Sequence, residues 1–98
     1  MIIGRFKIRS RPEHAEEIAA TIAAVEAPSR ELPGVVHFDI ARSLTEPDTF
    51  IAVEVFEDRQ AFDRQNAQEE VAELLRLINA GALIGDYEWT TWETTPSG

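Results

Sequence analysis

Residues 32–56 read LPGVVHFDIARSLTEPDTFIAVEVF, and this stretch decides the fold of the chain. Apolar residues recur at alternate positions over residues 35–40 and again over residues 50–56, with a polar loop between the two runs. Side chains alternate between the two faces of a β-strand. The pattern therefore predicts a long β-hairpin, and the turn-forming pair Pro33-Gly34 predicts the turn that leads into it.

One face of the predicted hairpin carries titratable groups. From the alternation of side chains we expect His37, Asp39 and Glu54 to share one face. Titratable groups in so apolar a sheet must be solvent-exposed, paired or functional. Two interpretations of His37 are open: an ion pair with a carboxylate, or a general base. The structural alternative for Glu54 is a pair with Arg5 or Lys7 of the preceding strand.

The segment before the hairpin predicts one strand and one helix. Residues 2–9 alternate between apolar and basic side chains, as a strand does. The helix is expected to begin at Ser10, with Glu13 closing a capping box. It is expected to end near Ala27, with a further turn to residue 30 left open, because Pro28 lacks an amide donor and clashes with the preceding turn.

The segment after the hairpin predicts a helical region and a last strand. Asp58 is a candidate helix cap, and the polar residues 63–68 interrupt the apolar stripe, which predicts a break there. Residues 86–94 are rich in aromatic and β-branched side chains and predict the last strand. We expect a single domain over residues 1–95 and a frayed tail at residues 96–98.

The order strand, helix, strand, strand, helix, strand predicts an α+β, ferredoxin-like βαββαβ fold. In this fold a four-stranded antiparallel sheet carries both helices on one face. Nothing in the chain is left to cover the other face, which combines charged and apolar side chains. Such a face suits a second copy of the sheet across a two-fold axis, so we expect a homodimer through the open sheet face.

Composition excludes several classes of protein. The 98 residues contain no cysteine and carry a formal net charge of −9. There is therefore no disulfide or thiolate chemistry, which fits a cytoplasmic protein. The negative charge argues against nucleic acid and anionic membranes as partners. No apolar run is long enough to span a bilayer, and the charged N-terminus does not resemble a signal peptide.

Two motifs carry a resemblance to a known family. The step ELPGV at residues 31–35 and the run VEVFEDRQAF at residues 53–62 resemble the antibiotic biosynthesis monooxygenase (ABM) family. The resemblance implies monomers that pair into a dimeric α/β barrel. It also implies kinship with cofactor-independent oxygenases that act on phenols or quinols, with a haem-degrading branch, and with members of no assigned activity.

The chain departs from the family pattern on the second helix. Gln65 and Glu70 stand where many members carry histidines, and in the haem-degrading branch such a histidine ligates iron. Without that histidine, and without cysteine, we expect no haem. The remaining histidines, His14 and His37, are far apart in the sequence, which also disfavours a metal site. We therefore expect a protein without a cofactor.

The resemblance predicts a cofactor-independent monooxygenase that acts on a phenolic, quinol or polycyclic aromatic small molecule. The predicted catalytic residues are His37, as the base, and Glu54. The residues predicted to bind the substrate are Tyr87, Trp89, Asn66 and Phe56. Tyr87 and Trp89 are expected on one face of the last strand and Trp92 on the other, where aromatic side chains also commonly fill a core or an interface.

Two other functions stay open. The missing helix histidine favours a non-catalytic dimeric module for small-molecule binding or protein interaction. The same barrel can also host a non-oxidative isomerase or cyclase, which needs only acid–base groups. Dioxygen uptake separates the oxygenase from both.

Overall fold

A computed structural model describes residues 1–94 of the chain. The predicted tail at residues 96–98 lies outside the described residues. The elements of the described residues, in chain order, are β1 (Ile2–Arg9), the short 3-10 helix η1 (Pro12–His14), α1 (Ala15–Glu31), β2 (Val35–Arg42), β3 (Thr49–Phe56), α2 (Arg59–Asn66), α3 (Glu69–Asn79) and β4 (Glu88–Glu93).

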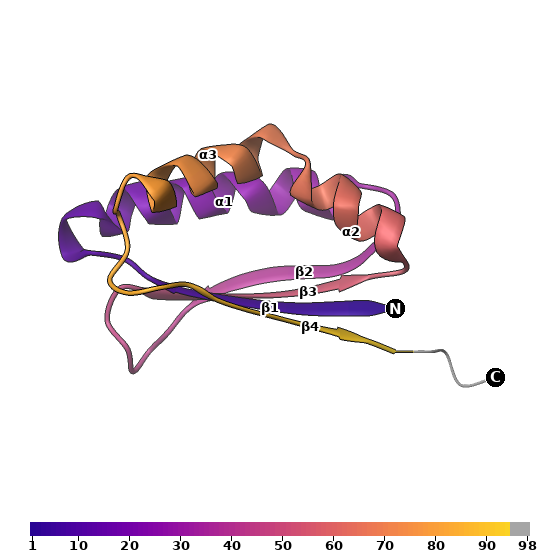
Figure 1. Cartoon of the computed structure of the whole chain (residues 1–98), viewed down its shortest axis with the longest axis horizontal. Coiled ribbons are helices and arrows are strands. Elements are labelled where there is room, and N and C mark those ends of the chain that lie inside the picture. Colours follow the sequence, from indigo (N-terminus) through magenta and orange to yellow (C-terminus); the bar gives the residue numbers. More distant parts are fainter. Residues whose placement is uncertain (95–98) are drawn as a thin grey trace.

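The strands form one antiparallel sheet in the order β2-β3-β1-β4. All the helices lie on one side of this sheet, and the other side is uncovered (Figure 1). The predicted ferredoxin-like α+β fold is confirmed. The central strands β1 and β3 come from opposite sides of α1 in the sequence, so the fold brings the N-terminal strand against the second strand of the hairpin.

The core lies between the sheet and the helices. In the register of β1 with β3, Ile8 is opposite Phe50 and Ile2 is opposite Phe56, so these four side chains point to the same face. The first pair packs in a cluster with the stripe of α1, and the second pair packs with Ala61 of α2. Burial of this apolar surface supplies the main stabilisation of the layers.

The first helix differs from the prediction at its start, and at its C-terminus it takes the longer of the two ends left open. Ser10 is not its cap: it is buried in an antiparallel bridge with Leu83, and its hydroxyl donates to the carbonyl of Arg11. The α-helix also continues through Pro28 to Glu31. The carbonyl that loses its partner there belongs to an exposed turn around Ala24, where water can replace the missing donor.

The second helical region follows the prediction. Asp58 caps α2, with its Oδ1 accepting a hydrogen bond from the amide of Ala61 at 2.9 Å. The helical region breaks at residues 67–68, within the predicted polar stretch, and α3 begins at Glu69. Because of the break, α2 and α3 run as two separate rods over the sheet (Figure 1).

Gly34 is required at the turn into β2. Its φ is 83°, and a Cβ there would lie 2.6 Å from the Cβ of Ala61. Gly34→Ala is therefore expected to lower the free energy of unfolding by about 2 kcal/mol, through backbone strain and a clash with α2. Urea denaturation measures the loss.

Gly81→Ala is the matched control for this prediction. Its φ of 92° imposes the same backbone strain, but a Cβ there would meet nothing within 4 Å. The loss at Gly34 should therefore exceed the loss at Gly81. Equal losses would show that the contact with Ala61 contributes nothing.

Candidate functional site

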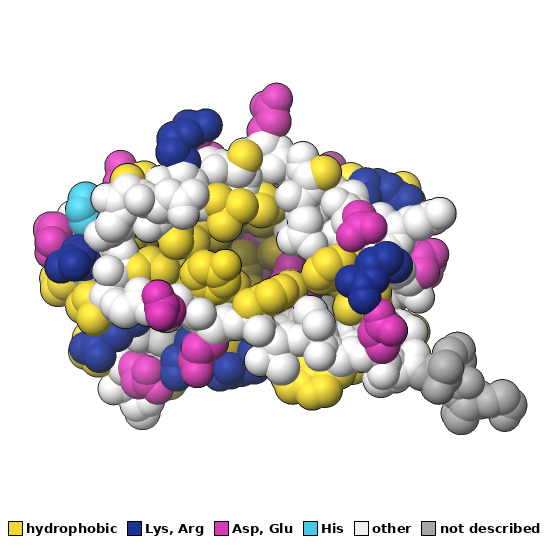
Figure 2. Space-filling model, viewed as in Figure 1, with side chains coloured by type: hydrophobic (Ala, Val, Ile, Leu, Met, Phe, Trp, Pro, Cys, Tyr) yellow, Lys and Arg dark blue, Asp and Glu magenta, His cyan; other side chains and the backbone are white. Residues whose placement is uncertain are grey.

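A cavity of about 240 Å³ lies between the sheet and the helices. Figure 2 shows it as a hollow in one side of the molecule, with hydrophobic side chains around it. Its lining is largely apolar: Phe6, Ile22, Val25, Phe38, Ile40, Phe50, Ala52, Val71, Leu74, Leu75, Tyr87 and Trp89. Three polar side chains complete the lining: Glu54, Gln65 and Asn66. A cavity of this kind, apolar with a few convergent polar groups, is typical of a small-molecule site.

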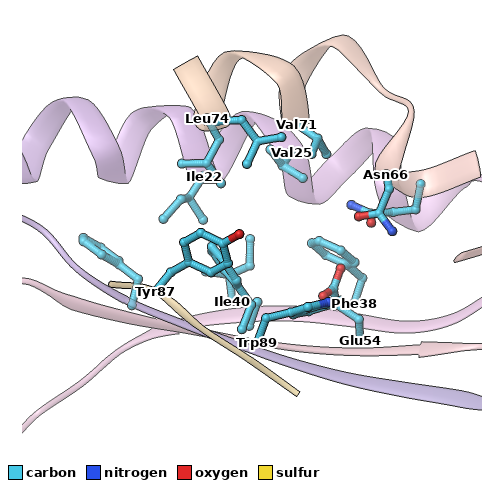
Figure 3. Close-up of a pocket in the computed structure, with 15 residues that line it drawn as sticks. Ile22, Val25, Phe38, Ile40, Glu54, Asn66, Val71, Leu74, Tyr87 and Trp89 are labelled. Atoms are coloured by element: carbon cyan, nitrogen blue, oxygen red, sulfur yellow. The ribbon is translucent and has the colours of Figure 1, made fainter. Parts of the chain in front are cut away.

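Glu54 is placed in this cavity by the register of the sheet. It pairs with Phe38 of β2 and with Gly4 of β1, and both belong to the face beneath the helices. Its carboxyl group points from β3 into the space below the helices, on the side of the cavity where Asn66 lies (Figure 3). Because side chains alternate between the two faces of a strand, the position of Glu54 in β3 fixes the direction of its side chain toward the helices.

The environment of Glu54 is unusual for a carboxylate. The residue is 5 % exposed, and within residues 1–94 no basic side chain forms an ion pair with it. Burial disfavours the charged form and raises the pKa of Glu54 from 4.5 to about 7. A carboxyl group with this pKa can release and accept a proton near neutral pH.

The prediction that His37, Asp39 and Glu54 share a face is wrong. His37 is opposite Val55 and Asp39 is opposite Val53, so both lie on the uncovered face of the sheet. Glu54 lies on the helix-covered face. The core requires this register, because it buries Phe38 and Phe50 together beneath the helices.

The predicted pairing of Glu54 with a cation of β1 is wrong for the same reason. Arg5 is opposite Val53 and Lys7 is opposite Ile51, on the uncovered face. Lys7 instead pairs with Glu46 of the hairpin loop at 3.0 Å. Asp39 lies 3.6 Å from Arg30 of α1. The role of His37 as a base stays a prediction, and its position separates it from the cavity.

Tyr87 and Trp89 form an aromatic wall of the cavity. The ring of Phe6 lies 5.6 Å from the ring of Tyr87 and 6.0 Å from that of Trp89, and Trp89 stacks on Phe62 of α2 at 6.0 Å. Both side chains point from the last strand region into the space beneath α1 and α3 (Figure 3). Trp92 pairs with Ile3 on the opposite face, as expected.

Gly4 makes room for the indole of Trp89. A Cβ at position 4 would lie 2.8 Å from Cη2 of Trp89 and 3.5 Å from Oε2 of Glu54. No side chain larger than hydrogen fits there without moving the indole. The strand therefore carries a glycine where the aromatic wall and the carboxyl group meet.

The second helix contributes two amides to the cavity. Asn66 was predicted as a binding residue and lines the cavity, with its Nδ2 donating to the carbonyl of Phe62 at 3.0 Å. The neighbouring Gln65 was not predicted as a site residue. It is 2 % exposed and lines the same cavity. The sequence signals for it were its place in the polar stretch of residues 63–68 and its position where the resembling family carries a histidine.

Phe56 does not line the cavity. It is 0 % exposed and packs in the cluster with Ile2 and Ala61, with the ring of Phe62 edge-on at 5.5 Å. The substrate contact predicted for Phe56 therefore has no geometric basis. The sequence places an aromatic residue at the end of the strand, but its burial follows from the packing of α2.

Within residues 1–94, no group of three or more histidine, aspartate or glutamate side chains is arranged to hold a metal ion. None of the helices there is long and apolar enough to cross a membrane.

The family model described as "Antibiotic biosynthesis monooxygenase" matches residues 1–77. Comparison with curated protein sequences gives no match. Many solved structures share the fold. One described as an antibiotic biosynthesis monooxygenase is 23 % identical, with a TM-score of 0.85 over 98 % of this chain and 100 % of that one.

Two other solved structures also share the fold of this chain. A Pseudomonas aeruginosa protein is 22 % identical, with a TM-score of 0.82 over 96 % of this chain and 93 % of that one. A Mycobacterium tuberculosis protein is 16 % identical, with a TM-score of 0.85 over 98 % of this chain and 96 % of that one. At these identities the likeness shows the fold alone.

Proposed function

This chain belongs to the antibiotic biosynthesis monooxygenase family, and from that membership and its cavity we propose that it is a monooxygenase acting on a phenolic, quinol or polycyclic aromatic small molecule. The observation that carries the proposal is the buried carboxyl group of Glu54 at the wall of an apolar, aromatic-lined cavity. No cation neutralises this group within residues 1–94, so its burial costs stability and calls for a functional reason.

Glu54 is the proposed base. Its carboxylate removes the proton from the substrate hydroxyl, and the resulting phenolate is electron-rich enough to react with dioxygen. A base whose pKa is near the working pH is best suited to this transfer. The apolar wall excludes water and holds the ring against Tyr87 and Trp89, which supplies desolvation and orientation.

The proposed reaction balances without another oxidant. The phenolate donates an electron to dioxygen, and the two radicals combine to a peroxide on a ring carbon that carries hydrogen. That carbon loses its hydrogen as a proton, the O–O bond breaks, and water leaves. One oxygen atom stays in the product as a carbonyl and the other becomes water, while the ring is oxidised to a quinone.

The test is dioxygen uptake against a panel of naphthols, hydroquinones and anthrones. The proposal expects uptake above autoxidation, with one atom of isotopically labelled dioxygen in the product and the other in water. Compounds that raise the melting temperature without any uptake would overturn the proposal. They would favour instead the binding module or the non-oxidative enzyme.

We also propose that the uncovered face of the sheet forms a homodimer. Val53 at its centre is 40 % exposed and Trp92 is 48 % exposed, and both belong to strands that no helix covers on this side. An uncovered sheet face with exposed apolar side chains among charged ones is typical of an isologous interface. The charged residues Arg5 and Lys7 on the same face fit its partly polar character.

Val53→Glu is expected to convert the dimer into a monomer, because it replaces an apolar contact at the centre of this face with a carboxylate. Sedimentation velocity measures the change. Leu44→Glu, in the exposed hairpin loop, is the control and should leave the oligomeric state as it is. A Val53→Glu variant that still sediments as a dimer would exclude this face as the interface.

A further inference from the structure

The amide of Gln65 is an unsatisfied polar group at the cavity. Its Nε2 donates to the hydroxyl of Ser29 in α1 at 3.3 Å, but its Oε1 is buried and has no partner among the described residues. A buried acceptor without a partner costs free energy, and such groups are rare in folded proteins. Gln65 is also one of the residues that line the cavity, so a turn of its side chain would present the amide to a bound molecule.

The contacts of Ser29 show that either orientation of the Gln65 amide leaves one of its polar atoms without a hydrogen-bond partner. Its Oγ accepts hydrogen bonds from both Gln65 and Gln68, the latter at 2.9 Å. If the amide of Gln65 turns over, Oε1 accepts the hydroxyl proton of Ser29 and Nε2 becomes the group without a partner. In either orientation one polar atom of Gln65 is left over.

A hydroxyl group satisfies both orientations, because it donates to an oxygen and accepts from an N–H. A carbonyl or an ammonium group satisfies only one. Gln65 is adjacent to Asn66, and Asn66 lies on the same side of the cavity as Glu54 (Figure 3). Away from these residues the lining is apolar apart from the hydroxyl of Tyr87 and the indole N–H of Trp89, so most polar groups of a ligand are expected at the end that holds Glu54, Gln65 and Asn66.

We propose that Gln65 selects aromatic ligands that carry a second hydroxyl group next to the one facing Glu54. This inference rests on the proposed function, since it assigns the first hydroxyl to Glu54. It gives the substrate class a pattern: two hydroxyl groups on neighbouring positions of a ring system that is otherwise apolar. Hydroxyl groups at opposite ends of the ring system leave the amide of Gln65 without this partner.

The test compares three ligands by calorimetric titration without dioxygen, so that binding is measured apart from oxidation. They are a naphthol, a naphthalene diol with neighbouring hydroxyls, and the isomer with hydroxyls at opposite ends. The protein is expected to bind the neighbouring diol roughly tenfold more tightly than either of the others. Gln65→Leu should bind all three about equally, and Gln65→Met, which keeps the length, should do the same.

Gln68→Leu is the matched control. Gln68 donates to the same Ser29 hydroxyl but does not line the cavity. This variant should keep the preference for the neighbouring diol and lose thermal stability. The Gln65 variants should keep or gain stability, because they remove a buried atom without a partner. A large loss of stability at Gln65 would instead assign it a structural role and overturn the inference.

Failure of the inference and failure of the proposed function give different results. If the preference exists and disappears in the Gln65 variants, the inference stands even when no compound consumes dioxygen. If dioxygen is consumed but the wild type shows no preference, or Gln65→Leu retains it, the inference falls and the monooxygenase stands.

Discussion

Glu54→Gln is expected to lower kcat/KM for dioxygen uptake by roughly 10²–10⁴-fold, the usual contribution of a positioned base. The amide keeps the shape of the carboxyl group but accepts no proton from a phenol. Because the pKa of Glu54 is raised to about 7, the wild-type rate should increase with pH through that value and level off above it. The variant should lack this step.

The control for this prediction is Glu73→Gln, an exposed residue of α3 that pairs with Arg76 and lies outside the cavity. Its uptake should equal that of the wild type. Unchanged uptake in Glu54→Gln would remove the carboxyl group from the chemistry. A large loss in His37→Ala instead would move the base to the uncovered face of the sheet.

The second large effect is on stability. Between about pH 4 and pH 8, the free energy of unfolding of the wild type is expected to fall by about 3 kcal/mol relative to Glu54→Gln. The folded-state pKa of Glu54 is raised from 4.5 to about 7 by burial. The folded protein therefore holds this proton more tightly than the unfolded chain.

The protonated carboxyl group of Glu54 therefore stabilises the folded protein at low pH. The protonated carboxyl contributes fully below the unfolded pKa of 4.5, and its contribution is lost as the pH rises through about 7. Urea denaturation of both proteins across this range measures the difference. If the difference in the free energy of unfolding between the wild type and Glu54→Gln stays constant with pH, Glu54 is hydrated or paired in the folded protein.

Much of the fold could be predicted from local patterns. The hairpin, the cap at Asp58 and the break after α2 follow from alternation, capping and a polar interruption, each of which acts within a few neighbouring residues. The start of α1, and the choice between its two possible C-terminal ends, could not be predicted in this way. Ser10 is held by a bridge to Leu83, which is distant in the sequence, and Pro28 is tolerated because its turn meets solvent.

The candidate site could be predicted only in part. The aromatic residues Tyr87 and Trp89 and the amide of Asn66 were found from composition and position, and all three line the cavity. The prediction that Glu54 shares a face with His37 and Asp39 was wrong. Alternation separates the residues of one strand into two faces, but it does not decide which of these faces a given residue of the next strand shares. Placing Phe38 and Phe50 in one core would have put Glu54 on the covered face.

The glycine at position 4 has a consequence for the dimensions of the cavity. Because a Cβ at position 4 would lie only 2.8 Å from the indole of Trp89, the place of the aromatic wall depends on a residue that has no side chain. Any larger residue there must displace the ring, and the cavity lies on the same face of the strand. Position 4 therefore sets how closely the indole of Trp89 approaches the strand, and with it the place of one wall of the cavity.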